Sequence, residues 1–94
     1  MLEIEVKDGG VVSLAGRLDA SESDRALEEL AKLPGPVTLD CERLEYISSA
    51  GIAIIMQTYK RLLAGRQTLH FTGVTPRVKN VFMYAGLDKL LGIT

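Results

Sequence analysis

Cysteine is almost absent from this sequence of 94 residues, which contains Cys41 alone. A single thiol cannot form an internal disulfide, and it cannot by itself supply a zinc site made of several thiolates. We therefore expect a fold that depends on neither a disulfide nor a metal ion, and we predict no cofactor.

Net charge is almost absent as well. Eleven Lys and Arg residues stand against twelve Asp and Glu residues, which leaves a net charge of −1 at pH 7. Proteins that hold DNA or RNA phosphates do so largely through an excess of Lys and Arg. We therefore predict that the chain does not bind nucleic acid directly.

Long hydrophobic runs are also missing. The longest mostly apolar stretch is Ala50–Met56, whereas a helix that spans a bilayer needs about 20 apolar residues. The first residues, Met1–Val6, alternate apolar and acidic side chains and lack the basic flank and apolar run of a signal peptide. We expect no membrane insertion and a cytoplasmic location.

The chain is short but sufficiently apolar to fold, since 47% of its residues are hydrophobic. A chain of this size buries about 60–68% of the surface that it exposes when unfolded. That is enough for one core and leaves no room for a second lobe around a large cofactor. We predict a single domain over residues 1–94, and the size argues against many multi-substrate enzymes.

The first elements follow from alternation and turn residues. Apolar and charged residues alternate in Glu3–Lys7, and a second β-like run follows in Val11–Leu14. Asp8–Gly10 lies between them, so the two runs predict a hairpin. Gly16–Asp19 is then expected to leave the sheet.

A helix is predicted next. Ser21, with Asp24 three residues later, resembles an N-cap, which places the helix at about Glu22–Leu33. Pro34–Pro36 ends it, because proline lacks the amide proton and the intervening glycine tolerates the dihedral angles of a helix end.

The spacing of apolar residues changes in the middle of the sequence. Val37–Leu39 predicts a short strand with Asp40 at its far end, followed by a loop over Glu42–Ile47. Apolar residues then recur at intervals of three and four, which predicts one face of a helix that ends at Gly65. The residues of this face are Ile52, Ile55, Met56, Tyr59, Leu62 and Leu63.

The last third repeats the alternation of strand and helix. Thr68–Thr72 predicts a strand, and Thr75 followed by Pro76 predicts a helix start. The apolar face of this helix comprises Val78, Val81, Phe82 and Ala85, and an apolar tail follows at Leu87, Leu90 and Leu91. We expect this tail to pack on its own chain.

This order of elements predicts an α/β fold. Strands that alternate with helices require right-handed crossovers, which give a parallel arrangement. The opening hairpin adds an antiparallel pair. We therefore predict a mixed, mostly parallel sheet of about four strands, with helices packed on it.

Chemistry is most plausible where the segment Tyr46–Ile52 leads into a helix. The loops beyond the carboxyl ends of strands are the usual functional edge of open α/β sheets, and a helix N-terminus favours an anion. A serine there would have an exposed hydroxyl that could accept a phosphoryl group, and the small Ala50 and Gly51 let another backbone come close. The alternative is that Ser48 or Ser49 only caps the helix.

A nucleophilic hydrolase is not supported. The sequence has no Gly-x-Ser-x-Gly motif, and its single histidine, His70, lies inside a β-like run. We predict that the chain has no catalytic residues and is not an enzyme.

Four segments, in a fixed order, carry a family resemblance. Gly16–Asp19 resembles a Gly-x-Leu-Asp turn, Leu39–Asp40 the end of a central strand, Tyr46–Ile52 a helix-start signature and Val81–Leu87 a last helix with its exit. Together they resemble the STAS domain, which bacterial anti-sigma factor antagonists and sulfate transporter tails share. The match covers nearly the whole chain, and its specificity lies in the ordered set.

The resemblance implies a function and a site. In antagonists of this family, the signature is typically Asp-Ser-(Ser/Thr)-Gly-Leu, and a partner kinase that is also the anti-sigma factor phosphorylates the serine after the aspartate. Alignment on the glycine makes Ser49 the phosphoacceptor and puts Ser48 where the aspartate stands. The implied docking residues are Arg17, Asp19, Ser48, Ser49, Ala50 and Gly51.

The resemblance also implies a cycle. The unphosphorylated chain binds the anti-sigma factor serine kinase and frees a sigma factor, phosphorylation of Ser49 releases the chain, and a serine phosphatase resets it. The alternative class is a non-switching STAS scaffold or accessory subunit, for example of a lipid-transport ATPase or a signalling complex. The retained Ser49 favours the switch.

Overall fold

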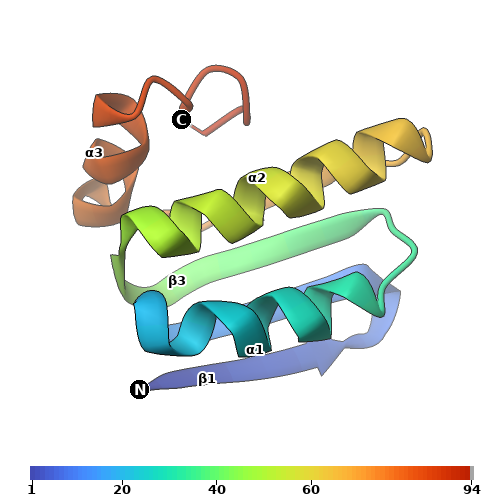
Figure 1. Cartoon of the computed structure of the whole chain (residues 1–94), viewed down its shortest axis with the longest axis horizontal. Coiled ribbons are helices and arrows are strands. Elements are labelled where there is room, and N and C mark those ends of the chain that lie inside the picture. The colour runs from blue at the N-terminus through green and yellow to red at the C-terminus, as the bar shows by residue number, and fades with distance from the viewer. Residues whose placement is uncertain (94) are drawn as a thin grey trace.

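A mixed four-stranded sheet carries the helices of the fold (Figure 1). The computed structural model describes residues 1–93. The sheet order is β1-β2-β3-β4, in which β1 and β2 are antiparallel and the β2–β3 and β3–β4 pairs are parallel. The strands are β1 (Leu2–Lys7), β2 (Val11–Leu18), β3 (Val37–Ile47) and β4 (Leu69–Thr72), and the helices are α1 (Ala20–Ala31), α2 (Ser49–Ala64) and α3 (Pro76–Tyr84). The predicted fold class is confirmed.

The helices α1 and α2 lie side by side across one face of the sheet, and α3 packs against β3 (Figure 1). The buried residues of the strands point to the face that the helices cover. The other face carries charged residues such as Glu3, Glu5 and Arg43, all of them exposed. This one-sided arrangement follows from the alternation of apolar and polar side chains along each strand.

The opening hairpin is as predicted, with a 3-10 turn at Asp8–Gly10. The prediction that Gly16–Asp19 leaves the sheet is wrong. Gly16 pairs with Leu44 and Leu18 pairs with Ile47, so β2 continues to Leu18. Glycine is usually unfavourable inside a strand, which is why this segment did not look like one. Gly16 is required here because its φ is positive, at 97°, and because a Cβ would clash with the carbonyl oxygen of Met1.

The first helix begins earlier than predicted. Its N-cap is Asp19, not Ser21, and it ends at Ala31 instead of Leu33. The hydroxyl of Ser21 donates a hydrogen bond to Oδ1 of Asp19 at 2.7 Å. The spacing of Ser21 and Asp24 imitated a capping pair because several polar residues follow one another in Ser21–Asp24 at the start of this helix.

The third strand is much longer than predicted. Asp40 lies inside β3, and the predicted loop Glu42–Ile47 is strand. The full length of β3 was not recognised because the strand has two irregularities. Its pairing with β2 shifts by one residue after Asp40 and again after Leu44. Each shift is a bulge, which interrupts the alternation of buried and exposed residues. Oδ1 of Asp40 accepts the backbone N–H of Glu42 at 3.1 Å and so stabilises the first bulge.

The second helix has the predicted end, with Gly65 as its C-cap. Its buried face is rotated from the prediction, because Leu63 is 58% exposed whereas Ile54 and Thr58 are buried. The Thr58 hydroxyl is satisfied by donating to the carbonyl oxygen of Ile54 at 2.9 Å. A threonine can therefore occupy a core position without an unpaired polar group.

The C-terminal part follows the prediction closely. Thr75 caps α3, Pro76 is its first residue, and the ring of Phe82 meets that of Phe71 edge-on with centroids 5.9 Å apart. In the tail, Leu91 is buried on its own chain as expected, whereas Leu90 is 53% exposed. Among the described residues, no helix combines the length and the apolar character that crossing a membrane requires.

Candidate functional site

Two parallel strands end side by side and each leads directly into a helix. Leu18 at the end of β2 pairs with Ile47 at the end of β3. Asp19 and Ser48 follow as the N-caps of α1 and α2. The backbone N–H of Ser48 donates to the carbonyl oxygen of Leu18 at 2.9 Å, which ties the two junctions together. The start of α2 therefore lies at the carboxyl edge of the sheet, where the sequence predicted the site.

The two serines of the signature have different surroundings. The Oγ of Ser48 accepts the backbone N–H of Gly51 at 3.1 Å, and its carbonyl oxygen accepts the N–H of Ile52. Ser48 is therefore the cap. Ser49 is the first residue of α2 and is exposed to solvent. The capping alternative for the pair thus applies to Ser48, and it leaves the hydroxyl of Ser49 accessible.

Gly51 fixes the close approach of α2 to the sheet. A Cβ at this position would lie 2.7 Å from the carbonyl oxygen of Leu18 and 2.8 Å from Cγ1 of Ile47. Such distances require a shift of the backbone. Gly51 is buried, so its contribution to the edge is to let α2 start directly against β2.

The two helix starts differ in charge. Asp19 caps α1 and Glu22 lies in its first turn, whereas the first turn of α2 contains no acidic residue. The hydrogen bond from Ser21 lowers the pKa of Asp19 below its usual 3.8. The hydrogen bond from Arg25 lowers the pKa of Glu22 below 4.5, helped by the N–H of Leu2. The positive end of α1 is therefore balanced by carboxylates, and that of α2 is not.

Arg17 and Tyr46 form a cation–π pair next to this edge. They are partners across β2 and β3, and the guanidinium carbon of Arg17 lies 4.2 Å from the centroid of the Tyr46 ring. Arg17 is exposed. Arg17 was predicted at this edge, but its pairing with Tyr46 was not, because Gly16–Asp19 and Glu42–Ile47 were both predicted to lie outside the sheet.

Comparison with known proteins decides the family. A family model described as "Mlab, STAS domain" matches residues 4–92. The chain belongs to the STAS domain family.

Known relatives of this STAS chain include BtrV of Bordetella bronchiseptica, which is provisionally named as an anti-sigma factor antagonist. The two are 31% identical over 90 residues, which cover 90% of this chain and 78% of BtrV.

Solved structures share the fold. A Thermotoga maritima protein, also provisionally described as an anti-sigma factor antagonist, superposes with a TM-score of 0.79 at 18% identity, over 97% of this chain and 83% of that one. The anti-sigma factor antagonist SpoIIAA in its unphosphorylated form superposes with a TM-score of 0.69 at 16% identity, over 99% of this chain and 100% of that one.

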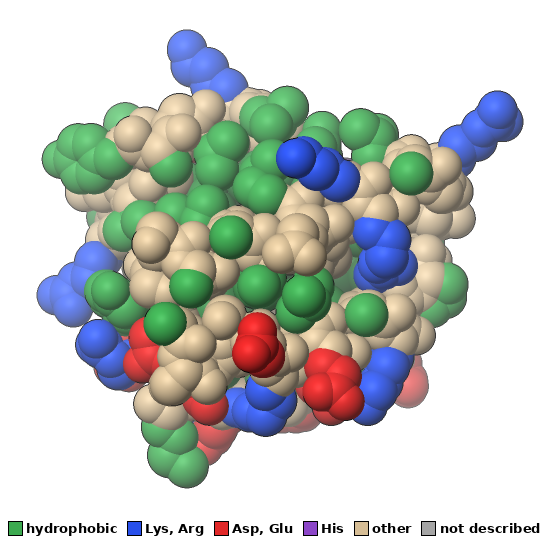
Figure 2. Space-filling model, viewed as in Figure 1, with side chains coloured by type: hydrophobic (Ala, Val, Ile, Leu, Met, Phe, Trp, Pro, Cys, Tyr) green, Lys and Arg blue, Asp and Glu red, His purple; other side chains and the backbone are tan. Residues whose placement is uncertain are grey.

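The six predicted docking residues of this STAS chain occupy the carboxyl ends of β2 and β3 and the first turn of α2. Ser49 is exposed, Ser48 and Ala50 are half-buried and Gly51 is buried. Figure 2 shows hydrophobic side chains gathered over α2, α3 and the C-terminal segment, whereas the acidic side chains lie over α1 and β1. The exposed members of the apolar part include Tyr84, at 90%, and Met83.

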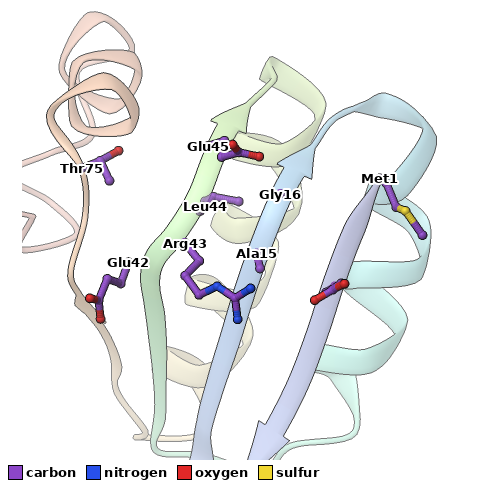
Figure 3. A pocket seen from close by; sticks show the side chains of 9 residues that line it. Met1, Ala15, Gly16, Glu42, Arg43, Leu44, Glu45 and Thr75 are labelled. Carbon is purple, nitrogen blue, oxygen red and sulfur yellow. The ribbon is translucent and has the colours of Figure 1, made fainter.

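A shallow hollow of about 460 Å³ lies on the sheet face that the helices leave uncovered. Figure 3 shows Arg43 reaching from β3 across β2, close to Ala15, with Glu42 and Thr75 on the other side of β3. The small Ala15 and Gly16 lie in this hollow, and Glu3, Glu42, Glu45 and Arg43 contribute charged side chains to its lining. This hollow was not predicted from the sequence, because the part of β3 that forms one wall was predicted to be a loop.

Cys41 lies on the core side of the same strand. It is 1% exposed, and burial, together with the nearby Asp40 carboxylate, raises the pKa of its thiol to about 12. The thiol therefore stays protonated at neutral pH and acts as a packed apolar group. Within residues 1–93, no three His, Cys, Asp or Glu side chains cluster in a way that could hold a metal ion.

Proposed function

We propose that this STAS domain is an anti-sigma factor antagonist that works by partner switching. With Ser49 unmodified, the edge at the start of α2 binds an anti-sigma factor that is also a serine kinase. Phosphorylation of Ser49 releases the chain, and a serine phosphatase restores it. The chain itself catalyses no reaction in this scheme, and the 31% identity with BtrV supports the antagonist role.

The main support for the proposal is that the two serines have different roles at the start of α2. Ser48 uses its hydroxyl to cap α2, so the exposed Ser49 is dispensable for the helix and accessible to a kinase. Ser48 stands where antagonists typically have an aspartate, and it retains the capping contact without the negative charge. A phosphoryl group on Ser49 would therefore meet less repulsion from its neighbour.

Phosphorylation at this position has opposite consequences for the free and the bound chain. The added charge is about −1.5 to −2 at neutral pH. In the free chain, the unpaired amides and the positive end of α2 stabilise it. In the complex, a partner that fits closely against Ala50 would bury the same charge without a counter-ion, which is unfavourable. Binding is thus lost while the fold is kept.

The test uses the purified chain, the anti-sigma kinase encoded in the same genome, and ATP. We expect one phosphoryl group, mapped to Ser49 by mass spectrometry. Ser49→Ala should bind the kinase as the parent does and resist release by ATP, whereas Ser49→Asp should weaken binding at least tenfold.

Thr68→Ala and Thr68→Asp are the matched controls, since Thr68 is also exposed and lies at the opposite edge of the sheet, where its carbonyl oxygen accepts the N–H of Val37 at the beginning of β3. Both should leave phosphorylation and binding unchanged. Equal affinity of Ser49→Asp and the parent would contradict the charge switch. Equal loss of phosphorylation in Ser48→Ala and Ser49→Ala would leave the assignment of the acceptor unsupported.

A second candidate is a constitutive STAS subunit of a lipid-transport ATPase. The matching family model is described as "Mlab, STAS domain" without mention of an anti-sigma factor, which is compatible with this candidate. In that role Ser49 is an ordinary exposed helix residue. Affinity purification from the native cells distinguishes the two candidates, because a histidine-kinase-like ATPase supports the switch and a transporter ATPase with unmodified Ser49 supports the subunit.

A further inference from the structure

Arg17 is held in place by an unusual feature of the sheet. Gly16 pairs with Leu44, but the next pair is Arg17 with Tyr46, so Glu45 is the extra residue of a bulge. In a regular ladder Arg17 would face Glu45, a residue of opposite charge. The bulge instead puts the guanidinium over an aromatic ring, 4.2 Å from its centroid. Bulges near functional edges commonly re-aim a side chain in this way.

The contact with Tyr46 gives the Arg17 guanidinium no oxygen acceptor. It is an attraction between a cation and an aromatic ring, whereas a guanidinium has several N–H donors that can bind oxygen atoms. Two other arginines are engaged differently: Arg25 bonds Glu22 and the carbonyl oxygen of Leu2, and Arg61 donates to the carbonyl oxygens of Leu30 and Leu33. Within residues 1–93, no such side-chain hydrogen bond or ion pair involves the Arg17 guanidinium. Arg17 is thus an oriented donor facing solvent.

We propose that the Tyr46 ring positions Arg17 to bind a carboxylate of the protein that docks at the start of α2. This inference rests on the proposed function and adds the chemistry of the contact. Arg17 precedes Leu18, whose carbonyl oxygen bonds the N–H of Ser48, so the guanidinium and the positive end of α2 belong to one edge. Both favour an acidic surface on the partner, and a planar guanidinium matches a carboxylate with two parallel hydrogen bonds.

The phosphoryl group of Ser49 is a less suitable ligand for Arg17. Leu18 is buried on the face that the helices cover, and side chains alternate along a strand. Arg17 therefore projects from the opposite face, whereas Ser49 begins the helix on the covered side. A partner carboxylate that reaches over the edge meets Arg17 directly.

The test measures the affinity of the anti-sigma kinase for variants of the whole, unphosphorylated chain by titration calorimetry. Arg17→Ala should weaken binding about tenfold or more, since a charge-assisted hydrogen bond is lost. Arg17→Lys should recover part of the affinity, because lysine keeps the positive charge but lacks the paired N–H donors of a guanidinium. Tyr46→Leu should weaken binding about two- to fivefold by freeing Arg17. Tyr46→Phe should bind as the parent does, because the ring and not the hydroxyl holds the guanidinium.

Lys60→Ala controls for net charge, since Lys60 is exposed and lies eleven residues, or about 16 Å, along α2 from Ser49. It should bind as the parent does, and circular dichroism checks that every variant is folded. Arg17→Ala with parental affinity, or with affinity reduced only in the phosphorylated chain, would overturn the inference. If Ser49→Asp still weakens binding in that case, the proposed switch stands without it, whereas parental affinity of both variants would overturn both.

Discussion

The starts of α1 and α2 occupy equivalent places and differ in how their charge is balanced. Each helix follows a parallel strand, and the strands end at the paired residues Leu18 and Ile47. At α1, one carboxylate belongs to the N-cap residue Asp19 and a second, that of Glu22, lies in the first turn. Glu22 also accepts the N–H of Leu2 at 2.7 Å, which fastens the beginning of β1 to the helix. The start of α1 is a structural junction with its positive end already neutralised.

The start of α2 is built without charge. A neutral hydroxyl caps it, and its next residues are Ser49, Ala50 and Gly51. The helix end therefore retains its partial positive charge and its small, accessible surface. Two helix starts at the same carboxyl edge of the sheet therefore differ in their capacity to accept an anion. The absence of an internal carboxylate in the first turn of α2 is what leaves this end open to an added anion.

The largest expected effect comes from disturbing the contact that joins the two junctions. Gly51→Ala would place a Cβ 2.7 Å from the carbonyl oxygen of Leu18 and 2.9 Å from its Cγ. We expect the free energy of unfolding to fall by about 2 kcal/mol, as for other overpacked positions, measured by urea denaturation.

Gly65→Ala is the matched control, because the nearest atom to a Cβ there is 3.6 Å away and φ is −87°. This change should leave stability unaltered or raise it by up to about 1 kcal/mol. Equal destabilisation of the two variants would mean that the close contact with Leu18 is not what requires glycine at position 51.

The second effect concerns the cap of α2 itself. Ser48→Ala removes the acceptor for the N–H of Gly51, and we expect a loss of about 1 kcal/mol in urea denaturation. Ser48→Asn should restore most of it, because asparagine is an equally good cap. The same change at the longer contact of α3, Thr75→Ala, should have a smaller effect, since Thr75 Oγ1 lies 3.4 Å from the N–H of Val78. A larger loss at Thr75 than at Ser48 would contradict this ranking.

Much of the fold could be predicted from the sequence because its signals are local. The hairpin turn, the proline segment before β3, Gly65 and the Thr75–Pro76 pair act within a few residues. The length of β3 could not be predicted in this way. Its two bulges separate the buried Cys41, Leu44 and Ile47 by three residues each, and a spacing of three does not indicate a strand. Bulges are set by the partner strand, and pairing between strands is not visible in a local window.

The position of the candidate site could be predicted from a local motif, whereas the contacts between its residues could not. Ser49 was placed at a helix start by a motif, and the structure puts it there. The partner of Arg17 depends on the register of β2 against β3, so Tyr46 could not be assigned to it. Gly51 was predicted as a small docking residue, whereas its burial against Leu18 emerges only once α2 packs on the sheet.

The pH dependence of stability should separate the two helix starts. The pKa values of Asp19 and Glu22 are lowered in the folded chain, the first by the hydrogen bond from Ser21 and the second by that from Arg25. Their contribution is present above the unfolded values of 3.8 and 4.5 and is lost as the pH falls through the folded values.

Measured from about pH 6 to about pH 3, the free energy of unfolding should therefore decrease in the parent. The free energy of unfolding should decrease less steeply with falling pH in Asp19→Asn and Glu22→Gln than in the parent. In Ser48→Ala it should decrease with the same slope as in the parent. A slope in Glu22→Gln that equals the parental one would show that α1 draws no stability from this carboxylate.

The smallest effect tests the contrast most directly, because one substitution is made at both ends. Ser49→Asp adds a carboxylate to the unbalanced start of α2, and we expect a gain of about 0.5 kcal/mol at low ionic strength. Ser21→Asp adds the same charge beside Asp19 and Glu22 and removes the hydrogen bond to Asp19. It should therefore give no gain or a small loss.

Thermal denaturation at low and high salt measures both variants, and salt should abolish the gain at Ser49 because it screens surface charges. A gain of equal size at Ser21 would mean that the carboxylates of α1 do not neutralise its positive end. The two helix starts would then accept an anion equally well, and the accessible hydroxyl of Ser49, not the charge of its surroundings, would be what distinguishes the start of α2.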